Sequence, residues 1–297
     1  MANFNMLGIL PHLTDRDRLL IRLLDRHQVL TTGQIHRLFF NAVRTCQIRL
    51  AALRKLGILD AFRYARLDGG SDPWHWTLGL AGARWQAAAT GRASPTERSH
   101  RERILRLSAT STLTHRVMTN EFFVRLAART RQDSATELLR WWPENDTLAR
   151  FLAIRPDGHG VWHDDRRAVG FFLETDMGTE NLPRLINKLP AYEQMIRMGG
   201  PVYPVLFWLP NVRRERHLAK LVANAKPGVQ VLTSTHDLDP AERVWWSAAT
   251  QRRLRIADID CDHGLDHIRN PNWVDGVLDL SDQVEEQHLS RLNRSDR

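Results

Sequence analysis

Two acidic residues near the middle of the chain are placed where carboxylates could share a metal ion. Asp157 follows Arg155-Pro156, and Glu174 ends an apolar stretch, 169–173, that predicts a central strand. Asp176 comes two residues later, and because side chains alternate along a strand, we expect it on the same face as Glu174. Mg²⁺ binds one or two carboxylates together with phosphate oxygens and water. Asp157, Glu174 and Asp176 are therefore candidate ligands of Mg²⁺ or Mn²⁺ and candidate catalytic residues for cleavage of nucleic acid.

Lys188 and Tyr192 add two further candidate catalytic residues. They lie one helical turn apart in a predicted helix, 182–197, and so share a helix face. Of the three tyrosines, only Tyr192 is expected near the carboxylates, because Tyr64 and Tyr203 fall on other elements. A covalent phosphotyrosine mechanism would therefore have to use Tyr192. Hydrolysis by water at a metal would need no tyrosine, and Lys188 would then stabilise the charge on the phosphate.

The elements around these residues predict a mixed α/β domain. Apolar spacing indicates the order α-β-β-β-α-β, and we expect Asp157 to leave the second strand and Glu174 to lie on the third. A helix over 213–225 and a strand over 229–233 follow. The core elements are expected at 113–129, 137–142, 152–157, 169–175, 182–197 and 202–209.

The first part of the chain predicts a second kind of domain. A helix begins at Thr14 or Asp15, a second at Thr31 or Thr32, and a third covers 42–56 after Asn41. Gly57 ends the third helix, and a β-hairpin with its tip at 68–72 follows. Three short helices before a hairpin are typical of a winged helix-turn-helix, so the fold class is α+β with a winged helix followed by the α/β domain.

The third helix of such a domain enters the major groove of DNA. Residues on the side of this helix away from its core face, and basic residues on the hairpin, are the candidate DNA contacts: Arg44, Thr45, Gln47, Ile48 and Arg49 on the helix, and Arg63 and Arg66 on the hairpin. The net charge of +8, carried almost wholly by arginine, favours a nucleic-acid partner. Arginine excess also follows from a GC-rich genome, and winged helices also serve as dimerisation or docking modules.

The expected organisation is a winged helix over 12–90, a linker over 91–112, a nuclease-like domain over 113–285 and a basic tail over 286–297. The chain lacks a run of about 18 apolar residues, so no membrane span is expected. Its two cysteines are far apart, which argues against a disulfide framework and suits the cytoplasm. A homodimer and protein partners in replication or conjugation remain open.

Cys261, His263 and His267 are of residue types that bind zinc. Gly264 interrupts the helix that would present the two histidines together, so a surface loop is the simpler interpretation. Trp245-Trp246 and Trp273 are expected to pack the C-terminal segment on the sheet.

The arrangement of Asp157, Glu174 and the following helix resembles the PD-(D/E)xK, or restriction-endonuclease-like, superfamily, with Asp176 where a lysine is usual. Lys188-x-x-x-Tyr192 is similar to the Gln-x-x-x-Tyr pattern of RecB-type nucleases. Such a pattern more often positions substrate in that superfamily, so the resemblance favours hydrolysis by water over attack by Tyr192. In that superfamily the lysine is known to migrate, so Lys188 is implied as its replacement. Glu121 falls where some members carry a further acidic residue.

Residues 14–235 as a whole resemble the replication-relaxation family of plasmid and integrative-element proteins, most specifically over Glu174 to Tyr192. The resemblance implies a sequence-specific DNA-binding protein that nicks or relaxes plasmid DNA at an origin for replication or conjugative transfer. Double-stranded DNA, with a single strand at the nick, is the implied partner. The alternative is a regulator or replication initiator whose nuclease-like domain does not cut. Asp157, Glu174 and Asp176 distinguish the two hypotheses: if these three carboxylates do not converge in the fold, the enzyme hypothesis fails.

Overall fold

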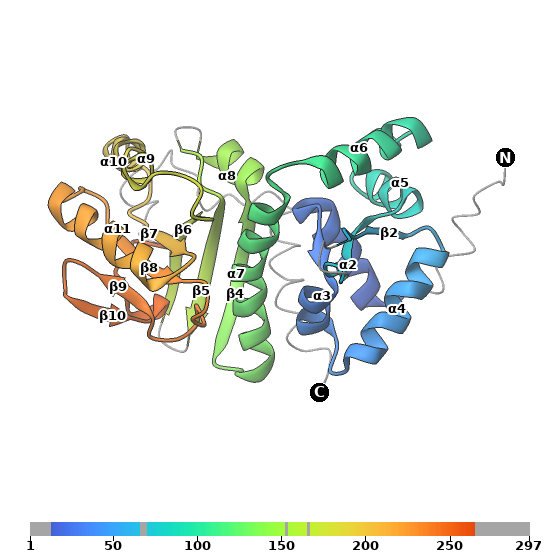
Figure 1. Ribbon diagram of the computed structural model, residues 1–297, viewed down its shortest axis with the longest axis horizontal. Coiled ribbons are helices and arrows are strands. Elements are labelled where there is room, and N and C mark those ends of the chain that lie inside the picture. The colour runs from blue at the N-terminus through green and yellow to red at the C-terminus, as the bar shows by residue number, and fades with distance from the viewer. Residues whose placement is uncertain (1–12, 66–69, 152–153, 165–166, 265–297) are drawn as a thin grey trace. The chain divides into compact units, whose positions relative to one another are not determined.

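A computed structural model describes residues 13–65, 70–151, 154–164 and 167–264. It is a mixed α and β structure that divides into two compact units, Met1–Val124 and Arg125–Arg297 (Figure 1). The division falls within helix α7 (Leu113–Gln132). Arg66, His267, Trp273 and the basic tail lie outside the described residues.

The first unit contains helices and a small sheet in the expected order. Each of the first two helices starts with a capping box, in which a threonine and the residue three positions later exchange hydrogen bonds. The third helix ends at Gly57, whose φ of 70° suits glycine. Its N-cap is Ala42, without a side-chain cap, rather than Asn41. The elements are α2 (Asp15–His27), β1 (Leu30–Thr31), α3 (Thr32–Phe39), α4 (Val43–Lys55), β2 (Leu59–Phe62) and β3 (His75–Leu78).

The sheet of this unit has the order β1-β3-β2, with both pairs antiparallel. Two more helices, α5 (Leu80–Ala89) and α6 (Glu97–Ala109), follow it. Arg103 of α6 donates hydrogen bonds to Thr77 and to the carbonyl of Leu78 on β3. Helix α6 occupies much of the expected linker, 91–112, and this segment belongs to the first unit.

The second unit is built on a seven-stranded mixed sheet with the order β10-β9-β8-β7-β6-β5-β4. Strands β4, β5 and β6 form an antiparallel meander, β6, β7 and β8 are parallel, and β9 and β10 are again antiparallel. The strands are β4 (Thr136–Pro143), β5 (Gly158–Asp164), β6 (Arg167–Thr175), β7 (Val205–Leu209), β8 (Val231–Thr235), β9 (Trp245–Ser247) and β10 (Arg252–Leu254).

Helices connect the strands of this sheet and cover it. Residues of α10 and α11, together with residues of β6, β7 and β8, form one apolar core cluster, so both helices pack on the same side of the central strands. Pro190 stands in the first turn of α10, where the expected single helix over 182–197 divides into two. The helices are α8 (Glu144–Arg150), α9 (Leu182–Ile186), α10 (Leu189–Arg197) and α11 (Val212–Ala225).

The prediction of a strand at 152–157 was wrong. Residues 154–157 form no strand, and the second strand of the meander is β5, which begins directly after Asp157. Its sequence, Gly-His-Gly-Val-Trp-His-Asp, has little strand character, but pairing on both sides with β4 and β6 holds it in the sheet. His159 of β5 is fully buried, and both of its ring nitrogens have hydrogen-bond partners. Nδ1 lies 2.8 Å from the Phe171 carbonyl, and Nε2 lies 3.3 Å from Arg140.

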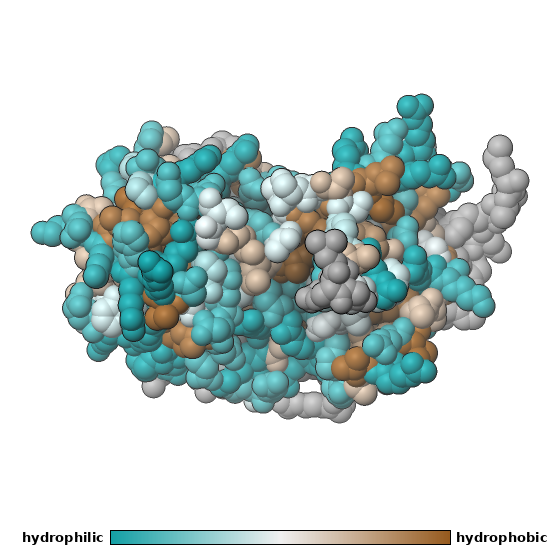
Figure 2. Space-filling model, in the orientation of Figure 1, coloured by the Kyte–Doolittle hydropathy of each residue, from teal (hydrophilic) through white to brown (hydrophobic). Residues whose placement is uncertain are grey.

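Apolar residues are largely buried in both units, and the face drawn in Figure 2 is mostly hydrophilic with a few hydrophobic patches. Trp245 is buried on β9, as expected for a residue that packs the last described segment on the sheet. Within the described part of the chain, no helix combines the length and apolar character needed to cross a bilayer.

Candidate active site and nucleic-acid interface

Asp157 and Glu174 come together at the start of β5 and the end of β6. Gly158 pairs with Leu173 in the antiparallel ladder, so the register continued by one residue sets Asp157 opposite Glu174. The Asp157 Oδ2 atom accepts a hydrogen bond of 2.7 Å from the backbone N–H of Thr175. The two carboxylates are close enough for the charge of Asp157 to raise the pKa of Glu174, although Asp157 precedes its strand instead of ending one.

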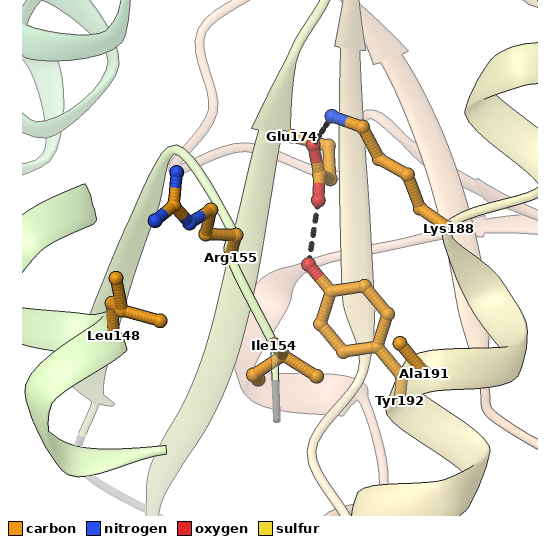
Figure 3. Close-up of a pocket in the computed structure, with 7 residues that line it drawn as sticks. All are labelled: Leu148, Ile154, Arg155, Glu174, Lys188, Ala191 and Tyr192. Atoms are coloured by element: carbon orange, nitrogen blue, oxygen red, sulfur yellow. Dashed lines mark hydrogen bonds and ion pairs between the residues drawn. The ribbon is translucent and has the colours of Figure 1, made fainter. Parts of the chain in front are cut away.

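Lys188 and Tyr192 both reach Glu174 from the helical segment after β6 (Figure 3). Lys188 Nζ lies 2.5 Å from Glu174 Oε2, and the Tyr192 hydroxyl donates to Oε1 at 2.6 Å. Tyr192 lies on α10, and Lys188 occupies the N-cap position of that helix. Lys188 and Tyr192 therefore meet at one carboxylate, although Lys188 lies directly before α10 and not within a single helix over 182–197. We call Asp157, Glu174, Lys188 and Tyr192 the Glu174 centre.

Burial and charge make this centre unusual. The Glu174 side chain is only 2% exposed, and burial, followed by the charge of Asp157, raises its pKa to about 7, although Lys188 and Tyr192 oppose the rise. Burial and then the charge of Glu174 raise the pKa of Tyr192 well above its ordinary value. Burial alone would lower the pKa of Lys188, but the charges of Glu174 and Asp157 raise it. Lys188 is therefore a cation and Tyr192 a neutral donor near pH 7.

Asp176 does not join this pair. Arg214 of α11 donates to both of its carboxylate oxygens, with Nη2 3.0 Å from Oδ1, and the backbone of Gly178 donates to Oδ1 as well. Two residues along a strand advance the chain by about 6.6 Å, which moves Asp176 from the start of β5 towards α11. The prediction that Asp157, Glu174 and Asp176 converge was therefore wrong. In the described part of the chain, no cluster of three or more His, Cys, Asp or Glu residues could hold a metal ion.

Glu121 also has another role than the resemblance implied. Its carboxylate lies 2.5 Å from Arg37 and 3.2 Å from the amide of Gln34, both on α3. It therefore ties α7 to α3 within the first unit.

Cys261 and His263 have partners in the second unit. The Cys261 thiol lies 4.0 Å from the Ala168 carbonyl, and His263 Nδ1 lies 2.8 Å from the Tyr203 hydroxyl. These contacts fasten the segment to β6 and to the loop before β7.

The candidate DNA contacts on α4 fall into two groups. Arg44, Thr45, Gln47 and Ile48 are exposed, as predicted for residues away from the core face, whereas Leu50 and Leu53 are buried. The same prediction was wrong for Arg49, which is half-buried and forms an ion pair with Asp17, itself 1% exposed. Burial alone would raise the pKa of Asp17, but hydrogen bonds from Arg49 and Thr14 hold it below its ordinary value. Arg49 is therefore engaged in joining α4 to α2.

Arg63, after β2, is exposed, and its guanidinium lies 4.6 Å from the centre of the Trp74 ring. It also donates to Ser71 across the hairpin at 3.2 Å. This contact presents the charge of Arg63 on the outside of the hairpin, where a phosphate could meet it.

Two arginines matter here although the sequence assigned them no role. Arg155 lines a pocket beside Glu174, and its position directly before Pro156-Asp157 could have signalled this. Arg214 holds Asp176 from a helix that is distant in sequence. No local pattern could have shown that pairing.

Comparison with known proteins agrees with the resemblance seen in the motifs. A model of the replication-relaxation family matches residues 21–205, which is more than half of the 297-residue chain. The match covers the Glu174 centre and most of the first unit. No curated protein and no solved structure matches the chain. The chain belongs to the replication-relaxation family.

Proposed function

We propose that this protein is a DNA-binding, metal-dependent nuclease or relaxase of a mobile element, which nicks or relaxes plasmid DNA at an origin for replication or conjugative transfer. Family membership suggests a role in replication or relaxation of such elements. The observation that carries the enzymatic part is the Glu174 centre, in which two neighbouring carboxylates, a lysine and a tyrosine border a pocket. Groups with strongly shifted pKa values in a pocket are typical of functional sites.

The order of the elements supports this assignment. When the short helices α8 and α9 are set aside, the observed order α7-β4-α8-β5-β6-α9-α10-β7 follows the αβββαβ order of restriction-endonuclease-like folds, with the candidate acids on β6 and directly before β5. The three helices and the β1-β3-β2 sheet of the first unit correspond to the order expected of a winged helix. We infer that the first unit recognises DNA and the second unit cuts it.

Asp157 and Glu174 fit a hard divalent cation, because Mg²⁺ or Mn²⁺ sites that act on phosphates need only one or two protein carboxylates. When bound, such a cation would supply charge neutralisation at the phosphate and a water of lowered pKa. Asp176 is left out of the proposed ligand set, since Arg214 already neutralises it.

The remaining residues of the centre have roles that follow from their contacts. The Lys188 side chain is 36% exposed, so its ammonium group can meet a phosphate oxygen while it stays close to Glu174. Tyr192 is buried and keeps its proton, so it orients the Glu174 carboxylate by donation. This favours hydrolysis by water over attack by the tyrosine.

Two observations favour the second candidate function, a regulator or initiator that binds DNA without cutting it. Asp157, Glu174 and Asp176 do not converge among the described residues, which is the outcome expected of a protein that does not cut, so the enzyme proposal rests on Asp157 and Glu174 alone. In addition, both oxygens of Glu174 already accept hydrogen bonds, from Lys188 and from Tyr192. A cation would have to share these oxygens or displace Lys188. A centre closed in this way would be a structural remnant.

A plasmid assay separates the two functions. Supercoiled plasmid that carries DNA from the neighbourhood of the gene is incubated with the protein and Mg²⁺ or Mn²⁺. We expect conversion to the open-circular or relaxed form, its loss with EDTA, and its loss in Asp157→Asn. Absence of conversion by a folded protein that still binds this DNA would favour the non-cutting regulator.

Two arginines of α4 provide a matched test of DNA recognition. Arg44→Ala should weaken specific binding by about 1–3 kcal/mol if Arg44 contacts a guanine, without loss of stability. Arg49→Ala should instead lower the free energy of unfolding by about 3 kcal/mol, because it leaves Asp17 buried without its ion pair. Gel-shift titration and urea unfolding measure the two effects. Unchanged binding in Arg44→Ala would argue against α4 as the element that reads DNA.

A further inference from the structure

A pocket of about 280 Å³ opens beside Glu174 within the second unit. Both apolar and charged side chains line this pocket (Figure 3). Leu148 and Arg155 lie on one side, Ala191 and Tyr192 on the other, and Ile154 lies between them. Charged groups come from Arg155, Glu174 and Lys188. The full lining is Leu148, Ile154, Arg155, Glu174, Lys188, Ala191 and Tyr192.

The chemistry of this lining specifies an amphiphilic occupant. Leu148 and Ala191, both half-buried, offer apolar surface to a flat ring or a sugar, and Ile154 and Tyr192 line the same pocket although each is almost fully buried. Arg155 offers a positive charge that suits an anionic group at one end of the occupant, whereas the charge of Lys188 is already paired with Glu174. A nucleotide joins an apolar ring to a phosphate in this way.

Arg155 is available for such a contact. Its side chain is 69% exposed, and its ion pair with Glu144 is long, at 3.9 Å between Nη1 and Oε1. Exposed pairs of this kind contribute little to stability, so the guanidinium can turn to a phosphate at small cost. Arginine can also grip a phosphate with two parallel hydrogen bonds.

The size of the pocket limits what can enter. Its volume is close to the lower end, about 300 Å³, of pockets that hold small molecules, so it accommodates one nucleoside and not a base pair. A base within a duplex is stacked and paired, and it can enter a pocket only after it leaves the stack.

We propose that this pocket holds one unpaired nucleotide next to the scissile phosphate, with Arg155 as the positioning residue for the neighbouring phosphate. The substrate of the Glu174 centre is then a melted or single strand of DNA. This inference rests on the proposed function, because it takes the Glu174 centre as the place of cleavage.

Binding to the full-length protein tests the proposal without cleavage. A labelled single-stranded oligonucleotide and the duplex of the same sequence are titrated in the presence of Ca²⁺, with fluorescence anisotropy as the readout. Leu148→Trp, which fills the pocket, and Arg155→Ala should each weaken single-strand binding about tenfold, the size expected for loss of one base or phosphate contact. Duplex binding should stay unchanged, because the first unit provides it.

Two further variants control for charge and for folding. Arg216→Ala removes an exposed arginine of α11 that does not line the pocket, and it should change single-strand binding by less than about twofold. Arg155→Lys keeps the charge and should recover part of the lost affinity, which a purely structural role of Arg155 would not predict. Unchanged single-strand binding in both Leu148→Trp and Arg155→Ala would overturn the proposal, as would an equal loss for single strand and duplex.

The source of the nucleotide is tested in the same titration. Thymidine monophosphate should not displace the oligonucleotide at comparable concentration, since a strand makes additional contacts. If thymidine monophosphate displaces the oligonucleotide, the pocket binds a free nucleotide, and the proposal of a DNA strand as its occupant is wrong.

Plasmid nicking and single-strand binding together distinguish a wrong pocket assignment from a wrong nuclease assignment. If wild-type protein nicks plasmid but Leu148→Trp and Arg155→Ala bind the single strand normally, the pocket proposal falls and the nuclease stands. If wild-type protein never nicks, yet both pocket variants lose single-strand binding, the nucleotide site stands and the nuclease falls.

Discussion

Glu174 and Glu215 are both buried in the second unit, but their surroundings differ. Glu215, on α11, is held by Arg253 through two parallel contacts of 2.9 Å, and Thr233 lies 3.4 Å from the same carboxylate. Glu174 has a single amine, Lys188, and a tyrosine, and a second carboxylate, Asp157, lies beside it. One glutamate is neutralised by a matching fork, whereas the other carries excess negative charge next to a pocket.

On the proposed function, this difference separates a carboxylate that stabilises the fold from one that takes part in cleavage. The Glu215–Arg253 pair joins α11 to β10 and leaves no charge uncompensated. Burial and Asp157 raise the pKa of Glu174 to about 7, so ionisation of Glu174 costs more in the folded protein than in the unfolded chain. A bound cation, as proposed for Asp157 and Glu174, would lower this cost.

The largest expected effect is on stability, at the Glu215 pair. Arg253→Met should lower the free energy of unfolding by about 3 kcal/mol, because it leaves Glu215 buried without its partner. Urea unfolding measures the loss. A change below about 0.5 kcal/mol would place the pair among ordinary surface contacts and remove the contrast with Glu174.

Lys188→Met should act mainly on nicking. Loss of the ammonium group should slow nicking by about 100-fold, the effect of removing one stabilising group from a developing charge. Its cost in stability at pH 7 should be smaller than that of Arg253→Met, because Glu174 can take up a proton. Nicking close to the wild-type rate would exclude Lys188 from the proposed role.

The pH dependence of stability sharpens the same contrast. The pKa of Glu174 is raised, so between about pH 4.5 and pH 7 the folded protein holds a proton that the unfolded chain releases. This group therefore makes the wild type less stable as the pH rises through that range, and its contribution levels off above pH 7. In Lys188→Met the decline should extend beyond pH 7, by up to about 1.4 kcal/mol per pH unit. Parallel curves for the two proteins would contradict the coupling of Lys188 to Glu174.

Tyr192→Phe should have the smallest effect. The change removes one hydrogen bond to Glu174, so nicking should fall by no more than about tenfold. No protein should remain attached to the nicked strand in either form. A 5′-linked protein–DNA adduct that disappears in Tyr192→Phe would establish attack by the tyrosine in place of water.

Local signals in the sequence were sufficient for most elements. Threonine caps at Thr14 and Thr31, the glycine at Gly57 and the apolar run before Glu174 each predicted an element that the structure contains. These signals work because each depends on neighbours within one or two turns. Strand β5 escaped prediction because its stability comes from two partner strands and not from its own residues.

The site was predictable in part for the same reason. Lys188 and Tyr192 were paired correctly because helix geometry relates residues four apart. Asp176 was misplaced because Arg214, its partner, comes from a helix that no local pattern connects to it. Likewise, nothing near Arg49 in the sequence indicated that Asp17 holds it. Ion pairs between distant segments depend on the packing of whole elements.

The most direct test of the account compares plasmid nicking by Glu174→Gln and Glu215→Gln, at a temperature where both variants are folded by circular dichroism. Both substitutions neutralise one buried glutamate of the second unit and preserve its size. The account predicts that Glu174→Gln shows no detectable nicking, whereas Glu215→Gln nicks at nearly the wild-type rate per folded molecule. Equal activity of the two variants would show that the Glu174 centre is a structural contact and not the place of cleavage.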